Sequence, residues 1–410
     1  MSDLASTQAI LQKLVRFDTT SRNSNLELIE WIEDYLKPYG VQLQRIENEE
    51  KTKAALLGTL APSPSEQNSN RARRGGNGHE GERSEGEYPP HQKGIVFSGH
   101  TDVVPVDGQN WNTPPFKMTE KAGKLYGRGT CDMKGFIACV LAMVPHWSKL
   151  ILKRPLHFAF SFDEEIGCRA AARIGEFIKA QSWNPMLVIV GEPTMMQPVA
   201  AHKGIYSFLT TVTGKEAHSS QTHIGVNAIA YAAKLIAKLD ELAQHCHHHQ
   251  DAEFCPPYST LQVGVIQGGT ARNIIPKQCQ FEWEIRPLPQ DEPPVALENF
   301  MAFQAELNAQ MKAISTECGV ETTPVTRVLS LKPEAQESLQ HLMLRLSESN
   351  AFQSVSYGTE AGILQSHGLP CYICGPGSIQ QAHIPNEYVE VEQIEKCLRF
   401  MQRIENITSI

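Results

Sequence analysis

Long hydrophobic runs are missing from this sequence of 410 residues. A membrane-spanning helix needs about 20 consecutive apolar residues, whereas the longest apolar stretch, around residues 137–144, has the length of a helix in a protein core. The N-terminal residues also lack the basic segment followed by an apolar one that marks an export signal. We therefore expect a cytoplasmic protein without a membrane span.

Clustered positive charge is scarce as well. Lys and Arg number 37 against 45 Asp and Glu, which gives a formal net charge of -8. Nucleic acid is an unfavourable partner for such a chain, because phosphate binding depends on clustered Lys and Arg. The ten cysteines follow no regular spacing, which in a cytosolic chain indicates reduced thiols rather than disulfides. Small-molecule substrates remain open.

The length predicts two domains, since one hydrophobic core rarely organises more than about 250 to 300 residues. Apolar strand-like runs alternate with helical patterns in the first half, which is typical of a mixed or parallel α/β sheet covered on both faces. After Pro198 the pattern changes to the order β-α-β-β-α-β of a ferredoxin-like α+β unit. We place a catalytic domain at residues 1–199 and 320–410 and an inserted domain at residues 200–319.

Residues 62–92 interrupt the first domain. They are rich in Pro, Ser, Gly, Asn, Glu and Arg and contain almost no large apolar side chains. Because such a composition cannot bury a core, we predict a flexible surface loop.

Acidic and histidine residues occur where the predicted strands end. In SGHTDVVP, His100 and Asp102 are two residues apart, so on a strand both side chains project from the same face. A histidine that binds a metal needs its other ring nitrogen held, and Asp102 suits an orienting role for His100 or its surroundings. Asp132, in GRGTCDMKG, stands at the predicted start of a helix at residues 134–147, where a simple N-cap is the alternative interpretation.

Further carboxylates and a second imidazole follow. FDEEIG places Glu164 and Glu165 together at the end of an apolar strand. Neighbouring side chains on extended backbone point in opposite directions, which favours one metal ligand and one general base. GEPT adds Glu192 and QAHIPNE adds His383. Two histidines with three carboxylate ligands suit a pair of divalent ions, provided that one carboxylate bridges both.

The order of these motifs resembles that of a known family. HTDVVP, GRGTCDMKG, the EE pair, GEPT and AHIPNEY are similar to motifs of the dinuclear zinc aminoacylase/carboxypeptidase family over nearly the whole chain. The resemblance implies a zinc-peptidase catalytic domain with an inserted dimerisation (lid) domain. It also implies two zinc ions per subunit, which cobalt can replace, and a cis peptide after the bridging aspartate.

The same resemblance implies a role for each acidic motif. The counterpart of Asp132 bridges both zinc ions, and the counterparts of His100 and His383 bind one each. Glu164 would be the general base. The implied metal ligands are His100, Asp132, Glu165, Glu192 and His383.

Residues of the inserted domain also gain roles from the resemblance. His218, in GKEAHSS, would reach the active site of the partner subunit in a homodimer and stabilise the oxyanion; by itself it is a histidine at a strand end. Asn273 in GGTARNIIP and Arg286 in EIRPLP would contact the substrate, and a planar guanidinium suits an α-carboxylate. The glycine turn that begins at Gly375 offers backbone N–H groups for the same carboxylate.

The implied reaction is hydrolysis of the amide bond of a small N-acyl amino acid. GTEAGILQ and HSSQTHIGVNAI are most similar to segments of deacetylases, but the motifs separate these poorly from desuccinylases, broad aminoacylases and dipeptidases of the family. A non-catalytic binding protein on the same fold, with residues 62–92 as its contact element, is the alternative from a different class.

Overall fold

The computed structural model describes residues 4–62 and 93–409. The chain divides into two compact units, unit 1 with residues 1–200, 333–353 and 359–410 and unit 2 with residues 201–332 and 354–358. The predicted loop at residues 62–92 lies outside the described residues except for its first residue. The boundary that we predicted at residue 319 differs from the observed one at Lys332, because the last strand of unit 2 begins at Gly319 and completes its sheet.

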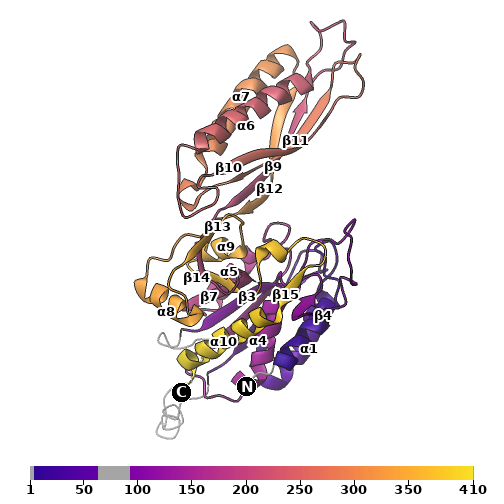
Figure 1. The fold of residues 1–410 in the computed structure, drawn as a ribbon. Coiled ribbons are helices and arrows are strands. Elements are labelled where there is room, and N and C mark those ends of the chain that lie inside the picture. The colour runs from indigo at the N-terminus through magenta and orange to yellow at the C-terminus, as the bar shows by residue number, and fades with distance from the viewer. Residues whose placement is uncertain (1–3, 63–92, 410) are drawn as a thin grey trace, which may run out of the picture. The chain divides into compact units, whose positions relative to one another are not determined.

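An eight-stranded mixed sheet forms the centre of unit 1 (Figure 1). Its strands are β1 (Gln42–Glu47), β2 (Ala54–Leu60), β3 (Ile95–His100), β6 (Leu156–Ser161), β7 (Leu187–Pro193), β8 (Val199–His202), β13 (Gln353–Val355) and β14 (Cys371–Gly375). The spatial order is β1-β2-β6-β3-β7-β14-β8-β13. Strands β6, β3, β7 and β14 are parallel, whereas β1, β2 and β8 pair antiparallel with their neighbours. This confirms the predicted mixed α/β sheet.

Helices cover both faces of this sheet. They are α1 (Leu4–Val15), α2 (Leu26–Leu36), α4 (Lys134–Trp147), α5 (Ala171–Ala180), α8 (Glu337–Ser347), α9 (Glu360–Ser366) and α10 (Val391–Thr408), with short 3₁₀ turns η1 (Lys37–Tyr39) and η3 (Ile379–Gln381). One core cluster joins α1, α2, α4, α8 and α10 to alternate residues of the central strands, such as Phe97 and Phe158. Helices α5 and α9 contact each other, and they also contact β6 and β14 respectively. Because successive strand residues face opposite sides, the central strands are buried throughout.

A small antiparallel sheet, which the sequence patterns did not predict, joins two distant segments of unit 1. It consists of β4 (Thr119–Lys121), β5 (Lys124–Tyr126) and β15 (Tyr388–Glu390) in the order β15-β5-β4. Strand β5 ends just before GRGTCDMKG and β15 follows AHIPNE. The pairing of β5 with β15 therefore brings the motif of Asp132 and the motif of His383 together.

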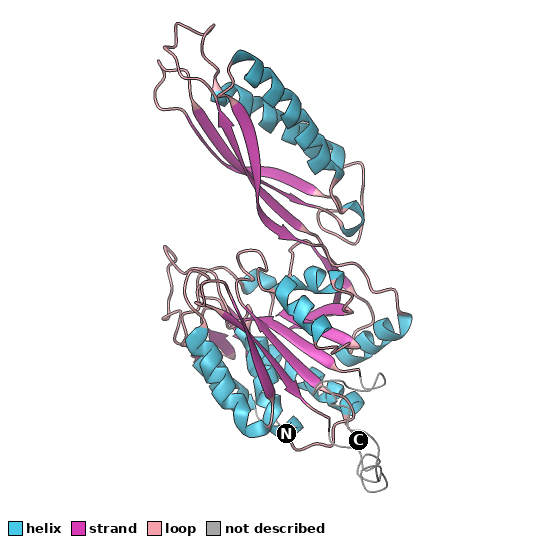
Figure 2. Ribbon diagram, turned by 180° about the vertical axis from the view of Figure 1, so that it is seen from behind, coloured by secondary structure: helices cyan, strands magenta, loops and turns pink. Residues whose placement is uncertain are grey.

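Unit 2 has the predicted β-α-β-β-α-β order. Its elements are β9 (Ile205–Thr213), α6 (Ala228–Cys246), β10 (Thr260–Gly268), β11 (Gln278–Arg286), η2 (Pro289–Asp291), α7 (Val295–Ile314) and β12 (Gly319–Val328). The strands form an antiparallel sheet in the order β10-β11-β9-β12, and both long helices lie on one face of it (Figure 2). Its core is separate from that of unit 1 and includes Phe281, Trp283 and Phe300. None of the described helices has the length and apolarity needed to cross a bilayer.

Candidate metal centre

The predicted ligands of unit 1 meet at one edge of the central sheet. His100 is the last residue of β3, Glu192 is the last residue but one of β7, and Glu164 and Glu165 follow the end of β6. These three strands are parallel neighbours, so their carboxyl ends lie at the same edge, where α/β sheets bind their ligands.

Asp132 lies between two imidazoles. Its Oδ1 is 2.9 Å from Nε2 of His100, and its Oδ2 is 3.2 Å from Nε2 of His383. The N-cap position of α4 is Met133, without a side-chain capping hydrogen bond, so the N-cap interpretation of Asp132 was wrong. The peptide between Asp132 and Met133 is cis, as the resemblance implied.

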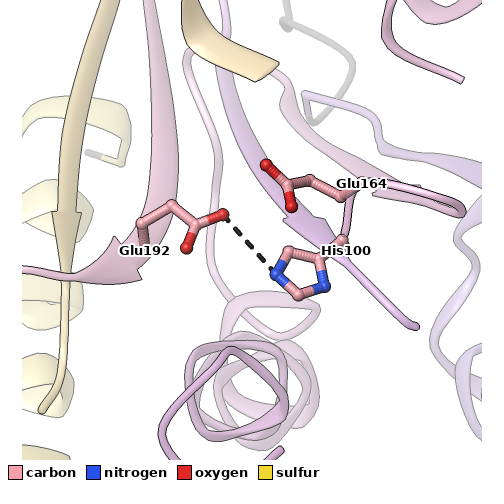
Figure 3. A group of neighbouring side chains, drawn as sticks. All are labelled: His100, Glu164 and Glu192. Carbon is pink, nitrogen blue, oxygen red and sulfur yellow. Dashed lines mark ion pairs between the residues drawn. The ribbon is translucent and has the colours of Figure 1, made fainter. Parts of the chain in front are cut away.

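The remaining carboxylates complete two groups around His100. His100, Glu164 and Glu192 place one candidate ligand atom each within 4.8 Å of one another, and so do His100, Asp132 and Glu165. Figure 3 shows the first group, in which Oε1 of Glu192 is 3.5 Å from Nε2 of His100.

The second group continues towards His383. Nε2 of His383 is 2.9 Å from Oε2 of Glu165 and also contacts Asp132. The structure therefore brings all five predicted ligands and the predicted base together.

The two adjacent glutamates do not follow the alternation that we assumed. Strand β6 ends at Ser161, Asp163 has a φ of 56°, and a turn begins at Glu165. The backbone is therefore not extended at the pair, and both carboxylates belong to groups that contain His100. The proposed division into base and ligand must rest on what each carboxylate contacts.

Asp102 holds two parts of the site through different atoms. Its backbone carbonyl accepts a hydrogen bond of 2.9 Å from Nδ1 of His100, while its carboxylate is 3.7 Å from that nitrogen. The carboxylate instead accepts the N–H groups of Glu164 and Glu165 at 3.1 and 3.3 Å. Asp102 thus directs Nε2 of His100 towards the other predicted ligands and fixes the turn that carries the two glutamates.

Burial and mutual repulsion make this cluster costly without a cation. Burial, followed by the charge of Asp132, raises the pKa of Glu192 well above its usual value. Burial also raises the pKa of Glu164 to about 8. Although burial opposes it, hydrogen bonds from His100 and His383 hold the pKa of Asp132 below its usual value. For His383, hydrogen bonds to Asp132 and Glu165 raise the pKa to about 10.

The side chains fit a pair of divalent cations. Within the described residues, Oε1 of Glu165 and Oε1 of Glu192 are buried without a hydrogen-bond partner. A buried carboxylate oxygen without a donor is unfavourable unless a cation occupies its other side. Imidazole nitrogens with carboxylate oxygens are also the ligand types that zinc and similar ions bind.

The predicted residues of the inserted domain lie in unit 2, and we describe them within that unit. His218 is exposed, its Nδ1 is 2.8 Å from Oγ of Ser220, and it forms a β-bridge with Ile274. The loops of His218 and Asn273 are therefore side by side. Arg286 donates to both carboxylate oxygens of Glu284, at 3.0 and 3.4 Å. A substrate carboxylate would have to compete with Glu284 for this guanidinium.

Gly375 differs from our expectation. Its N–H donates to Oγ1 of Thr194, and the N–H of Gly377 donates to Oε1 of Gln393. Both groups are thus used within the chain rather than offered to a ligand. A side chain at Gly375 would overlap the backbone of Gly191, so the glycine is explained by the close approach of β14 to β7.

Three residues in the surroundings of the site were missed by the sequence reasoning. Glu387, Arg128 and Gln109 form a hydrogen-bonded chain beside Asp132 and His383. Glu387 and Arg128 stand inside quoted motifs, PNE and GRG. Their position inside these motifs could have marked both residues as neighbours of the site. It did not show which residue pairs with the charge of Glu387 or of Arg128.

Comparison with known proteins shows the family to which the chain belongs. The profile of peptidase family M20/M25/M40 matches residues 96–405. An acetylornithine deacetylase of Myxococcus xanthus is 34% identical over 412 residues, which covers 98% of this chain and 98% of that protein.

Two solved structures share the fold over nearly their whole length. An aminopeptidase from Bacillus cereus has a TM-score of 0.70 at 18% identity, with 98% of both chains covered. A dinuclear metal-binding peptidase of the M20 family from Bacillus subtilis has a TM-score of 0.59 at 14% identity, again with 98% of both chains covered. The profile match and the full-length similarity to the Myxococcus protein place the chain in peptidase family M20/M25/M40, as a metal-dependent hydrolase of amide bonds.

Proposed function

We propose that this enzyme removes the acetyl group from N2-acetyl-L-ornithine to give L-ornithine and acetate, a step of arginine biosynthesis. Full-length similarity to the Myxococcus xanthus acetylornithine deacetylase supports the substrate. The observation that carries the reaction is the carboxylate of Asp132 between the Nε2 atoms of His100 and His383, with further carboxylates around both imidazoles.

The cofactor in this proposal is a pair of zinc ions, which cobalt can replace. Asp132 would be shared, and each imidazole would serve one ion together with the glutamate that it contacts, Glu192 for His100 and Glu165 for His383. Bound in this way, the ions lower the pKa of water towards neutrality and polarise the acyl carbonyl.

Glu164 acts as the general base in this proposal. It takes a proton from the attacking water and delivers that proton to the leaving amine, so the amide and water become acetate and ornithine. Its position supports the role, because Glu165 is already held by His383 while Glu164 is not. The Asp102 carboxylate fixes the backbone N–H of Glu164, and the Cys168 thiol donates to Oε1 of Glu164 at 3.3 Å.

His218, Asn273 and Arg286 complete the proposal. In a homodimer formed through the inserted domain, His218 of one subunit stabilises the oxyanion in the active site of its partner. The exposure of His218 and its pairing beside the Asn273 loop support a surface role for this segment. Arg286 and Asn273 bind the substrate, with the guanidinium of Arg286 directed to the α-carboxylate.

A substrate panel tests the proposed reaction. Metal-reconstituted enzyme is assayed with N-acetylornithine, N-acetylmethionine, N-succinyl-diaminopimelate and a dipeptide, by ninhydrin detection of the released amine. The expected result is the highest kcat/KM for N-acetylornithine, lost after chelation and restored by zinc or cobalt. A higher kcat/KM for any other substrate would contradict the substrate assignment, and activity that survives complete metal removal would contradict the metal centre.

A further inference from the structure

A buried carboxylate lies directly behind the loop of Asp132. Glu387 is 1% exposed, and its oxygens accept the N–H groups of Gly129, Cys131 and Asp132 at 3.0, 2.9 and 3.1 Å. The same carboxylate accepts a hydrogen bond of 2.6 Å from Arg128. Charged hydrogen bonds of this kind hold a backbone segment more firmly than neutral ones. The backbone of Asp132 is thus fixed by a residue that belongs to neither group of candidate ligands.

Arg128 extends this arrangement in the other direction. It is buried, one guanidinium nitrogen contacts Glu387, and the other donates to Oε1 of Gln109 at 2.7 Å. The amide nitrogen of Gln109 then donates to the backbone oxygen of His383 at 3.0 Å. A continuous path of hydrogen bonds therefore runs from the N–H of Asp132 to the carbonyl of His383.

The two sides of the metal centre differ in how they are supported. His100 is fully buried at the end of a central strand and donates to the carbonyl of Asp102. The side chain of His383 is 50% exposed, and its backbone, outside any helix or strand, has a φ of 62°. The sheet holds the first imidazole, whereas the second depends on contacts made by its loop.

We propose that Glu387, Arg128 and Gln109 are positioning residues that hold the His383 loop against Asp132 and so set the affinity of the metal ion on the His383 side. The inference rests on the proposed two-metal centre. Residues that orient metal ligands typically change metal affinity by about 10-fold to 100-fold when they are removed. Because His100 has its own support, loss of the contact between Gln109 and the His383 loop should weaken the binding of one ion only.

Gln109→Met is the variant that tests this. Methionine matches glutamine in length but neither accepts from Arg128 and Trp111 nor donates to His383. Because Gln109 is only half-buried, we expect the variant to fold. Gln380→Met is the matched control, because Gln380 is exposed, lies three residues before His383, and has a side chain that forms no hydrogen bond within the described part of the chain. Apo-proteins are titrated with cobalt and followed by calorimetry and by the visible absorption of the bound ion.

The expected result is a Kd for one of two cobalt ions that rises about 10-fold to 100-fold in Gln109→Met, with the other Kd and both constants of Gln380→Met unchanged. The absorption spectrum of the ion that remains should match that of a His383→Ala variant with one ion bound. Wild-type affinity for both ions in Gln109→Met, or an equal loss of both, overturns the inference while the two-metal centre stands. A wild-type protein that binds fewer than two ions overturns the two-metal centre and this inference with it.

A second variant tests the buried end of the path. Glu387→Gln replaces an acceptor oxygen with an N–H donor that faces backbone N–H groups, and Glu390→Gln on β15 is its control. Because Glu387 also holds the backbone of the shared Asp132, weaker binding of the ion on the His383 side, alone or together with the other ion, supports the inference. Two unchanged constants in a folded Glu387→Gln protein contradict it. If this variant does not fold, Gln109→Met alone decides.

Discussion

Asp102 illustrates how much of the site the sequence could predict at the scale of single residues. Its spacing from His100 predicted an orienting residue, and the structure shows that it orients His100 through its carbonyl and the glutamate turn through its carboxylate. Spacing fixes which residues are near one another, but the atom that makes the contact depends on the turn after β6, which residue patterns do not encode. The contacts of Glu387 were missed for the same reason, since its partners lie more than 250 residues away.

The proposed roles of Glu164 and His218 predict complementation between subunits. Glu164→Ala removes the base and should lower kcat about 10²-fold to 10⁴-fold, while His218→Ala removes an oxyanion donor and should lower it about 10²-fold to 10³-fold. A heterodimer of the two variants contains one site with Glu164 from one subunit and His218 from the other. Random mixing makes about half of the dimers heterodimers, so about a quarter of the wild-type activity should return.

Activity and metal content of the two variants are measured separately and after joint refolding. The metal content of Glu164→Ala should stay at the wild-type value. Each variant refolded alone is the control, and a mixture no more active than the better variant would contradict sharing of the site across a dimer. Substantial turnover by metal-loaded Glu164→Ala would contradict the base assignment.

At the scale of elements, the sequence predicted the helices whose pattern of apolar residues extends over many residues. The helix expected at residues 134–147 is α4, and the two helices of the predicted β-α-β-β-α-β unit are α6 and α7. Strands β4, β5 and β15 have three residues each. Such short strands are stabilised by their pairing across the chain and show no periodicity of their own.

A substitution of Gly191 tests how closely α4 packs against β7. A Cβ at this position would overlap the ring of Phe136, which is fully buried on α4. Gly191→Ala should therefore lower the free energy of unfolding by about 1–3 kcal/mol through overpacking, and it should weaken metal binding because Glu192 is the next residue. Urea unfolding followed by circular dichroism measures the first effect, and cobalt titration measures the second.

Gly264→Ala is the matched control for this substitution. Gly264 lies in β10, and a Cβ there would meet no atom within 4 Å. Alanine in a strand without steric conflict should leave stability unchanged or raise it slightly. If the two variants have the same urea midpoint of unfolding, the contact between β7 and α4 can accommodate an additional methyl group.

At the scale of the whole molecule, the described residues of each unit form a main hydrophobic core of their own, beside a small cluster of Ala201, Phe254 and Leu288. The core of unit 1 is built from the central sheet and its helices, and the core of unit 2 from β9, β11, α6 and α7. Composition and the change of pattern after Pro198 predicted this division, but not its second boundary. The predicted β-α-β-β-α-β order already included the strand at residues 319–328, but the boundary that we set at residue 319 left this strand out of the inserted domain.

Two buried histidines of the central sheet also respond to acid. Burial lowers the pKa of His157, on β6, to about 3, and that of His202, the last residue of β8, to about 4. An unfolded histidine has a pKa of about 6.5, so between these values the unfolded chain binds more protons than the folded one. Stability contributed by the neutral ring is complete above pH 6.5 and falls as the pH drops towards 3 or 4.

Linkage gives the size of the effect for His157. Between pH 7 and pH 5, the free energy of unfolding of unit 1 should fall by about 2 kcal/mol because of this residue alone.

His157→Gln keeps a partner for Oγ1 of Thr59, which His157 contacts at 2.9 Å, but cannot be protonated. The variant should lose about 2 kcal/mol of the pH dependence, measured by urea unfolding of apo-proteins at both pH values so that metal release does not contribute. If the two units unfold separately, this difference appears in the unit 1 transition, to which His157 belongs. If the pH dependence of wild type and variant is equal, folding does not lower the pKa of His157, and the residue is protonated at pH 5 in the folded protein too.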